Sequence, residues 1–169
     1  MYNIVKYNRP LRQFSLIERY FDDEEISEIL KFEENHIYQK GKVKHLGTPE
    51  VVNNSRNNMV FGLTPNADNI WLFDKFQFII SQVNHDVFLY DLNGFELFQF
   101  TKYEKNEFYN WHLDTEMHYT KFERKMSAII MLSDNSEYTG GDFEIIIDGN
   151  PENIQNIKLN KGDVFFFAS

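Results

Sequence analysis

His112 and Asp114 are the residues of this sequence whose types and spacing point most directly to chemistry. They lie two positions apart in a stretch that alternates like a β-strand, so both side chains are expected on the same face. An imidazole and a carboxylate on one face can bind the same metal ion and supply two of the three ligands of a facial triad. Such a triad suits Fe(II), because it leaves positions open for a co-substrate and dioxygen.

A His-x-Asp pair alone is weak evidence, because an exposed histidine next to a turn aspartate gives the same pattern. The surroundings strengthen the metal interpretation, since the pair ends a predicted strand and is followed by an apolar strand, a Gly140-Gly141 turn and two further apolar strands. The other histidines have no partner pattern and are interpreted as surface or structural residues: His36, His45, His85 and His118.

The elements that must position this pair are short strands in the second half of the chain. Six are predicted, over residues 95–103, 109–114, 124–132, 142–147, 157–159 and 164–168. Turns rich in Gly, Asn, Asp and Ser separate them, and no helix is predicted between them. This succession favours antiparallel pairing, as in a sandwich or jelly roll, over a parallel sheet.

The first half of the chain has a mostly helical pattern from residue 14 to about residue 84. Asp22 or Asp23 can cap a first helix, and a second is predicted to begin after Asp68, each with apolar residues three and four positions apart. Residues 47–66 between them are rich in Asn, Gly and Pro and carry one basic residue, Arg56. We expect a long loop there, either a plain connection or a binding loop.

Length, charge and composition exclude several classes of protein. A chain of 169 residues is expected to form a single domain. A net charge of −9 argues against binding to nucleic acid, and no apolar run is long enough to cross a membrane. The absence of cysteine excludes disulfides and thiolate metal sites. Without a signal-peptide pattern, we expect a cytoplasmic protein.

Six segments carry a likeness to a known family: QFTKY (99–103), YNWHLD (109–114), RKMS (124–127), LSD (132–134), YTGGDF (138–143) and KGDVFFF (161–167). In their order and spacing the sequence resembles the Fe(II)- and 2-oxoglutarate-dependent dioxygenases, specifically the prolyl 4-hydroxylase-like or PKHD-type hydroxylases. The likeness covers about the last seventy-five residues.

The resemblance implies roles for individual residues. His112 and Asp114 match the first two iron ligands of the family. Tyr103 matches the tyrosine that contacts the distal carboxylate of 2-oxoglutarate, with an ordinary strand aromatic as the alternative. Arg124 is either a carboxylate-binding residue or a solvated strand end. Tyr109, like Trp111, either shapes the pocket or only packs.

The resemblance also implies a fold and an activity. The expected fold is mainly β with N-terminal helices (α+β), a double-stranded β-helix or cupin-like jelly-roll barrel, with residues 1–94 as helical support and loop and 95–169 as the core. The implied reaction is hydroxylation of an unactivated C–H bond, in a prolyl residue of a peptide or in a small metabolite. The implied cofactors are Fe(II), 2-oxoglutarate and dioxygen, with ascorbate as a reductant.

Two family features lie beyond the last predicted strand: a histidine as the third ligand, and an Arg or Lys that anchors 2-oxoglutarate. Because a chain end inside an apolar strand would leave a barrel edge exposed, we expect the natural chain to continue past Ser169. Two alternatives stay open at this point, a non-catalytic jelly-roll binding module and a degenerate family member. The oligomeric state is also open.

Overall fold

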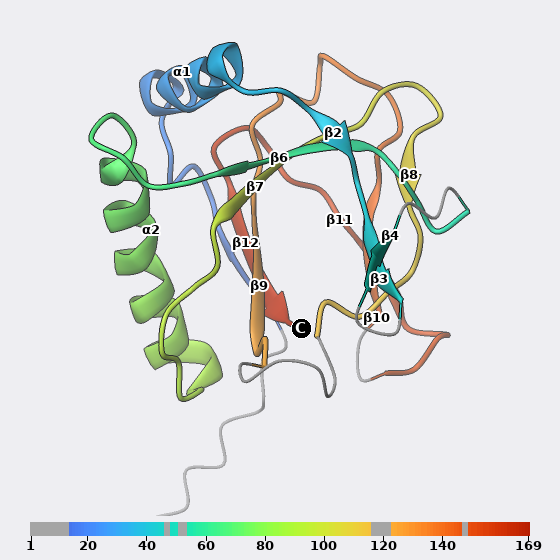
Figure 1. The fold of residues 1–169 in the computed structure, drawn as a ribbon. Coiled ribbons are helices and arrows are strands. Elements are labelled where there is room, and N and C mark those ends of the chain that lie inside the picture. The colour runs from blue at the N-terminus through green and yellow to red at the C-terminus, as the bar shows by residue number, and fades with distance from the viewer. Residues whose placement is uncertain (1–13, 46–47, 51–53, 116–122, 147–148) are drawn as a thin grey trace, which may run out of the picture.

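The computed structural model describes residues 14–45, 48–50, 54–115, 123–146 and 149–169. They form mostly β-structure with two α-helices, α1 (Asp23–Lys31) and α2 (Ile70–Val83), which lie on one side of the strands (Figure 1). A 3-10 turn, Phe32–Asn35, follows α1, and a π-helical turn, Asn84–Phe88, follows α2. No helix within these ranges is both long and apolar enough to cross a bilayer.

The strands of the described residues are short and pair antiparallel throughout, as the sequence predicted. Their bounds are β1 (Phe14–Ile17), β2 (Gln39–Lys40), β3 (Val43–His45), β4 (Thr48–Glu50), β5 (Arg56–Asn57), β6 (Met59–Leu63), β7 (Phe98–Lys102), β8 (Phe108–Tyr109), β9 (Met126–Ile130), β10 (Phe143–Ile146), β11 (Ile154–Ile157) and β12 (Val164–Ala168).

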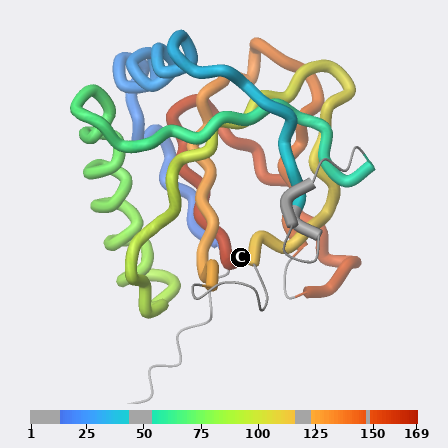
Figure 2. Tube along the Cα trace, in the orientation of Figure 1, coloured from blue at the N-terminus to red at the C-terminus, as the bar shows by residue number. Residues whose placement is uncertain are grey.

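Two three-stranded sheets form the framework, in the orders β1-β12-β9 and β2-β6-β7. The pairs β10-β11, β3-β4 and β5-β8 are separate two-stranded units. Figure 2 shows the N-terminal strand β1 running beside the C-terminal strand β12, in register from Phe14 with Phe167 to Ile17 with Val164. No sheet closes on itself among the described strands, so the expected mainly β class with helices is confirmed but a closed barrel is not shown.

Helix α1 begins where the sequence predicted, because its N-terminus carries a complete capping box. The Asp22 carboxylate accepts a hydrogen bond from the backbone N–H of Glu25 at 2.9 Å, and the Glu25 carboxylate accepts one from the backbone N–H of Asp22 at 3.0 Å. Ile26 and Ile29 then face the core, 1% and 2% exposed.

Helix α2 joins the two sheets into one core. Its buried residues recur at three- and four-residue intervals: Leu72, Phe73, Phe76, Ile79 and Val83. The Phe76 ring lies 4.9 Å from the ring of Phe98 on β7 and 6.1 Å from the ring of Phe166 on β12, centroid to centroid. The Phe98 ring is also 4.8 Å from that of Phe73, centroid to centroid. These aromatic contacts hold both sheets against one helix.

A tight turn before β12 fastens the N-terminal elements to the first sheet. The backbone N–H of Phe21 donates to the Gly162 carbonyl at 3.1 Å, and the N–H of Gly162 donates to the Met131 carbonyl at 2.8 Å. The fully buried Asp163 carboxylate accepts hydrogen bonds from the backbone N–H of Arg19 at 2.9 Å and of Asn160 at 2.8 Å. The turn therefore links β1, α1 and β9.

The prediction of one long loop over residues 47–66 is wrong, because this stretch contains β4, β5 and β6. Strand β6 pairs with β7, and the stacked rings of Phe61 and Phe100 lie 4.4 Å apart across the pair. Strands β1, β2 and β3 also interrupt the region predicted as mostly helical. The Asn-rich composition suggested a loop, whereas pairing with distant strands decides the backbone conformation.

Candidate metal centre

The candidate site begins where β8 meets β5, with Tyr109 directly opposite Arg56 in the antiparallel pair. Just beyond the pair, the backbone N–H of Asn110 donates to the Ser55 carbonyl at 2.9 Å, and its side-chain amide donates to the Asn54 carbonyl at 2.7 Å. The chain is thus fixed two residues before His112. The predicted strand over 109–114 is wrong beyond Tyr109, because residues 110–115 are not part of a β-strand.

The structure still brings His112 and Asp114 together. Nε2 of His112 lies 3.0 Å from Oδ1 of Asp114. Nδ1 of His112 lies 2.6 Å from the Asn110 carbonyl oxygen, so Nδ1–H donates to that oxygen and Nε2 is directed to the carboxylate. The Tyr109 ring stacks on the imidazole, with centroids 3.6 Å apart and planes at 15°. Local contacts rather than strand alternation therefore orient this pair.

The pair is electrostatically coupled. Burial lowers the pKa of His112, but the hydrogen bonds to Asp114 and to the Asn110 carbonyl raise it, and the net shift is upward. Burial raises the pKa of Asp114, while hydrogen bonds from His112 and Ser127 lower it, and the net shift is downward. Both shifts favour an imidazolium next to a carboxylate.

The geometry of the pair fits two positions of one metal site. Two ligands bound at about 2.1 Å and at right angles to each other lie about 3.0 Å apart, which matches the separation of Nε2 and Oδ1. A metal-binding histidine usually donates its other N–H to a carbonyl or carboxylate, as Nδ1 of His112 does to Asn110. No group of three or more His, Asp or Glu suited to a metal occurs within the described residues.

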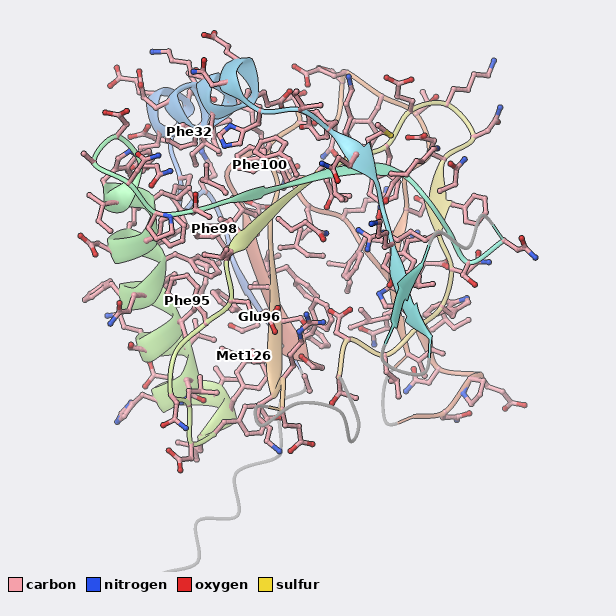
Figure 3. The ribbon with its side chains drawn as sticks, in the orientation of Figure 1. Phe32, Phe95, Glu96, Phe98, Phe100 and Met126 are labelled. Carbon is pink, nitrogen blue, oxygen red and sulfur yellow. The ribbon has the colours of Figure 1, made fainter. Side chains whose placement is uncertain are left out.

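Arg124 supports the backbone of the pair. Its Nε and Nη2 donate to the two carboxylate oxygens of Glu96 at 2.8 and 2.7 Å, and its Nη1 donates to the Asp114 carbonyl at 3.1 Å. Glu96 lies in the segment before β7 and reaches the start of β9 (Figure 3). Arg124 therefore ties Asp114 to a protein carboxylate.

Replacing Arg124 with methionine is expected to lower the affinity for Mn(II) about tenfold, because the Asp114 backbone loses its hydrogen-bonded support. Titration of the protein with Mn(II), followed by electron paramagnetic resonance, measures the effect. Lys125→Met is the matched control, since among the described residues the Lys125 ammonium pairs with the exposed Glu123 and not with the metal pair. Equal affinities for the two variants would contradict the supporting role of Arg124.

Tyr103 lies one residue beyond β7, in line with Asn58 after the last β6-β7 pair, Met59 with Lys102. Burial raises the pKa of Tyr103, and the smaller effects of Asn58 and Arg56 lower it, so the hydroxyl stays protonated at neutral pH. Arg56 and Asn58, 7% and 0% exposed, were not selected as site residues from the sequence. The only signal for them was the single basic residue of an Asn-rich stretch.

The remaining residues considered in the sequence analysis either have other surroundings in the structure or lie outside the described residues. His36 stacks on Phe61, with centroids 4.6 Å apart, and His85 is exposed beside Asp86. Trp111 is 53% exposed, and His118 lies outside the described residues.

A mainly antiparallel β-fold with helices along one side, carrying a His-x-Asp pair shortly after a strand, is compatible with a mononuclear metal-dependent oxygenase. The sequence profile of the 2OG-Fe(II) oxygenase superfamily matches residues 98–169. Over these residues, which are less than half of the chain, the sequence is similar to that superfamily. The superfamily implies Fe(II), 2-oxoglutarate and dioxygen as cofactors.

Solved structures share the fold. The viral collagen prolyl hydroxylase of Paramecium Bursaria Chlorella virus-1, solved with 2-oxoglutarate, has a TM-score of 0.68 and 19% identity over 93% of this chain and 78% of its own. A Pseudomonas putida prolyl-4-hydroxylase gives 0.67 and 18% over 93% and 81%. A Trichoplax adhaerens prolyl hydroxylase, in complex with a hypoxia inducible factor oxygen degradation domain peptide fragment, gives 0.72 and 15% over 93% and 73%. No curated protein sequence matches this chain.

Proposed function

We propose that this protein hydroxylates an unactivated C–H bond and that His112 and Asp114 supply two ligands of its iron. The observation that carries the proposal is the 3.0 Å separation of Nε2 and Oδ1, with Nδ1 held by the Asn110 carbonyl. Bound Fe(II), with 2-oxoglutarate, supplies the activation of dioxygen: one oxygen atom goes to the substrate as a hydroxyl group and the other to succinate, with release of carbon dioxide.

The residues of this chain prepare the site by controlling protons and orientation. The Asn110 carbonyl keeps one proton on Nδ1 of His112, so Nε2 is the ligating atom. A proton held on Nε2 or on Asp114 must leave when a metal binds, because both ligands bind in their deprotonated form. Arg124 and Ser127 then hold Asp114 through its carbonyl and its carboxylate.

The finer features of the activity are also proposals. We infer a double-stranded β-helix built on the two sheets, and Tyr103 as a contact of the distal carboxylate of 2-oxoglutarate. The structural similarity to prolyl hydroxylases supports a prolyl residue in a peptide as the substrate, with a small metabolite as the alternative. Ascorbate as a reductant and a cytoplasmic location are further predictions, as is the single domain over residues 1–169.

Anaerobic titration of the Fe(II)-loaded protein with 2-oxoglutarate is expected to produce a weak visible charge-transfer band. Admission of air should then yield succinate, because slow uncoupled turnover needs no substrate. Absorbance and succinate assays measure the two steps. A protein that binds Fe(II) but gives neither band nor succinate would contradict the proposal and would instead be a non-catalytic binding module.

A further inference from the structure

The segment between α2 and β7 contains an asparagine followed directly by a glycine, Asn93-Gly94. No other asparagine of the sequence precedes a glycine. In this dipeptide the side-chain amide of the asparagine is open to attack by the backbone nitrogen of the next residue, because glycine has no Cβ to shield that nitrogen. The pair therefore carries the two groups that react with each other in asparagine deamidation.

The fold leaves this pair open to water. Asn93 and Gly94 are both exposed and belong to neither a helix nor a strand. No hydrogen bond joins the Asn93 side chain or the Gly94 N–H to another described residue. A Cβ atom at position 94 would meet no atom of the described residues within 4 Å, so space is open around the attacking nitrogen. Both reacting groups are therefore accessible in the folded chain.

The segment is held on either side of the pair. Before it, the Asn84 side chain accepts from the Tyr90 N–H at 2.9 Å and donates to the Tyr90 carbonyl at 2.8 Å. After it, the Phe95 ring lies 6.0 Å from that of Phe73 and 5.6 Å from that of Phe76, centroid to centroid. Asn93 thus lies between two anchored points without being bonded itself, whereas the Asn84 amide is occupied at both ends.

Asn135-Ser136 shows how the same fold protects a comparable pair. The Asn135 amide donates to Oδ1 of Asn160 at 2.9 Å, and its Oδ1 accepts from the Tyr138 hydroxyl at 2.7 Å. The Ser136 N–H, which would be the attacking nitrogen, donates to Oδ1 of Asp134 at 2.9 Å. A reaction at Asn135 must first break these hydrogen bonds, and at Asn93 there are none of this kind to break.

We propose that Asn93 is a site of spontaneous deamidation in the folded protein. The Gly94 nitrogen forms a bond to Cγ of Asn93, the Cγ–Nδ2 bond breaks, and ammonia leaves with the proton of the attacking N–H. Water then opens the resulting five-membered succinimide. Cleavage of the new N–Cγ bond gives aspartate. Cleavage of the bond from that nitrogen to the backbone carbonyl carbon gives isoaspartate, in which the chain runs through the former side chain.

The products change the charge and the backbone of this segment. Either product adds a carboxylate between two exposed acids, Asp91 and Glu96, and makes the net charge of −9 more negative by one. Isoaspartate also lengthens the backbone by one atom, three residues before Glu96, whose carboxylate accepts from Arg124 (Figure 3). The protein is therefore expected to separate into charge forms as it ages.

Incubation of the full-length wild type at mildly alkaline pH, followed by peptide mapping, tests the proposal. Trypsin cleavage after Lys75 and Lys102 places Asn84 and Asn93 in one peptide, and tandem mass spectrometry tells them apart. Each conversion raises the mass by about 1 Da, because a hydroxyl replaces an amino group. We expect Asn93 to react at least about tenfold faster than Asn84 or Asn135, because the amides of those residues are hydrogen-bonded.

A parallel incubation in urea tests the part played by the fold. Unfolding should raise the rates at Asn84 and Asn135 toward that at Asn93 and change the rate at Asn93 little. A rate at Asn93 that is at least about tenfold lower in the folded protein than in urea would show protection and overturn the inference. A rate at Asn93 no higher than those at Asn84 and Asn135 in the folded protein would overturn it as well.

Asn93→Gln is the matched variant, because glutamine keeps the exposed amide but would have to form a six-membered ring. Its more acidic form, followed by anion-exchange chromatography, should accumulate at least about tenfold more slowly than that of the wild type. Asn135→Gln should leave the accumulation unchanged. An acidic form that appears equally fast in wild type and Asn93→Gln would place the reaction at another residue and contradict the proposal.

Discussion

Replacing His112 with alanine is expected to lower Mn(II) affinity at least about 100-fold and to abolish both the 2-oxoglutarate absorption band and succinate formation. The substitution removes one of the two close ligands, and losing an outer-shell partner alone typically costs 10- to 100-fold in affinity. The fold should be little affected, because His112 lies in an irregular, partly exposed segment. Mn(II) titration and thermal unfolding separate these two effects.

His85→Ala is the matched control for this prediction. His85 is an exposed histidine with its own aspartate neighbour, since Nδ1 lies 2.8 Å from Oδ1 of Asp86. Its removal should leave metal binding unchanged, because both side chains of this pair are highly exposed. Unchanged Mn(II) affinity in a folded His112→Ala protein would show that the His112–Asp114 contact is an ion pair only.

The elements that the sequence predicted well are those specified by local contacts. The capping box of α1 lies within four residues, and the apolar spacing of α2 is visible along one segment. Four strands of the second half, β7, β9, β10 and β12, were also located to within a few residues, because turn residues separate them. The predicted strands 109–114 and 157–159 overlap β8 and β11 at one residue each. By contrast, β5 and β6 are defined by partners on β8 and β7 about forty to fifty residues later, so no local pattern revealed them.

The candidate site shows the same division between local and distant information. The His112–Asp114 contact could be predicted from spacing, although the Asn110 carbonyl and the Tyr109 ring provide the orientation that was attributed to a strand. Arg56 could not be placed near it, because that proximity depends on the register between β5 and β8. The guanidinium of Arg124 donates to Glu96, which lies twenty-eight positions earlier in the chain. The residues on either side of Arg124 in the sequence give no indication of this pairing.

Substituting alanine for Gly162 is expected to destabilise the fold more than any surface change, by about 3 kcal/mol or more. Gly162 has a φ of +87°, and a Cβ atom there would lie 2.1 Å from the backbone carbonyl oxygen of Phe21. The carbonyl cannot move away freely, since the Phe21 N–H is itself bonded to the Gly162 carbonyl. The melting temperature should fall by about 6–12 °C or more, measured by circular dichroism or calorimetry.

Gly149→Ala separates the two causes of the lost stability, which are the backbone strain of a positive φ and the steric contact with Phe21. Gly149 also has a positive φ, +64°, but a Cβ atom there would meet no atom of the described residues within 4 Å. Its substitution should therefore cost only the backbone strain of a left-handed residue, about 1–2 kcal/mol. If both variants melt at the same temperature, the close approach of Gly162 to Phe21 does not contribute to stability. A larger loss of stability at Gly162 would show that this turn holds β1 and α1 against β12. Strand β12 pairs with β9, and β9 carries Ser127, whose hydroxyl stabilises the Asp114 carboxylate.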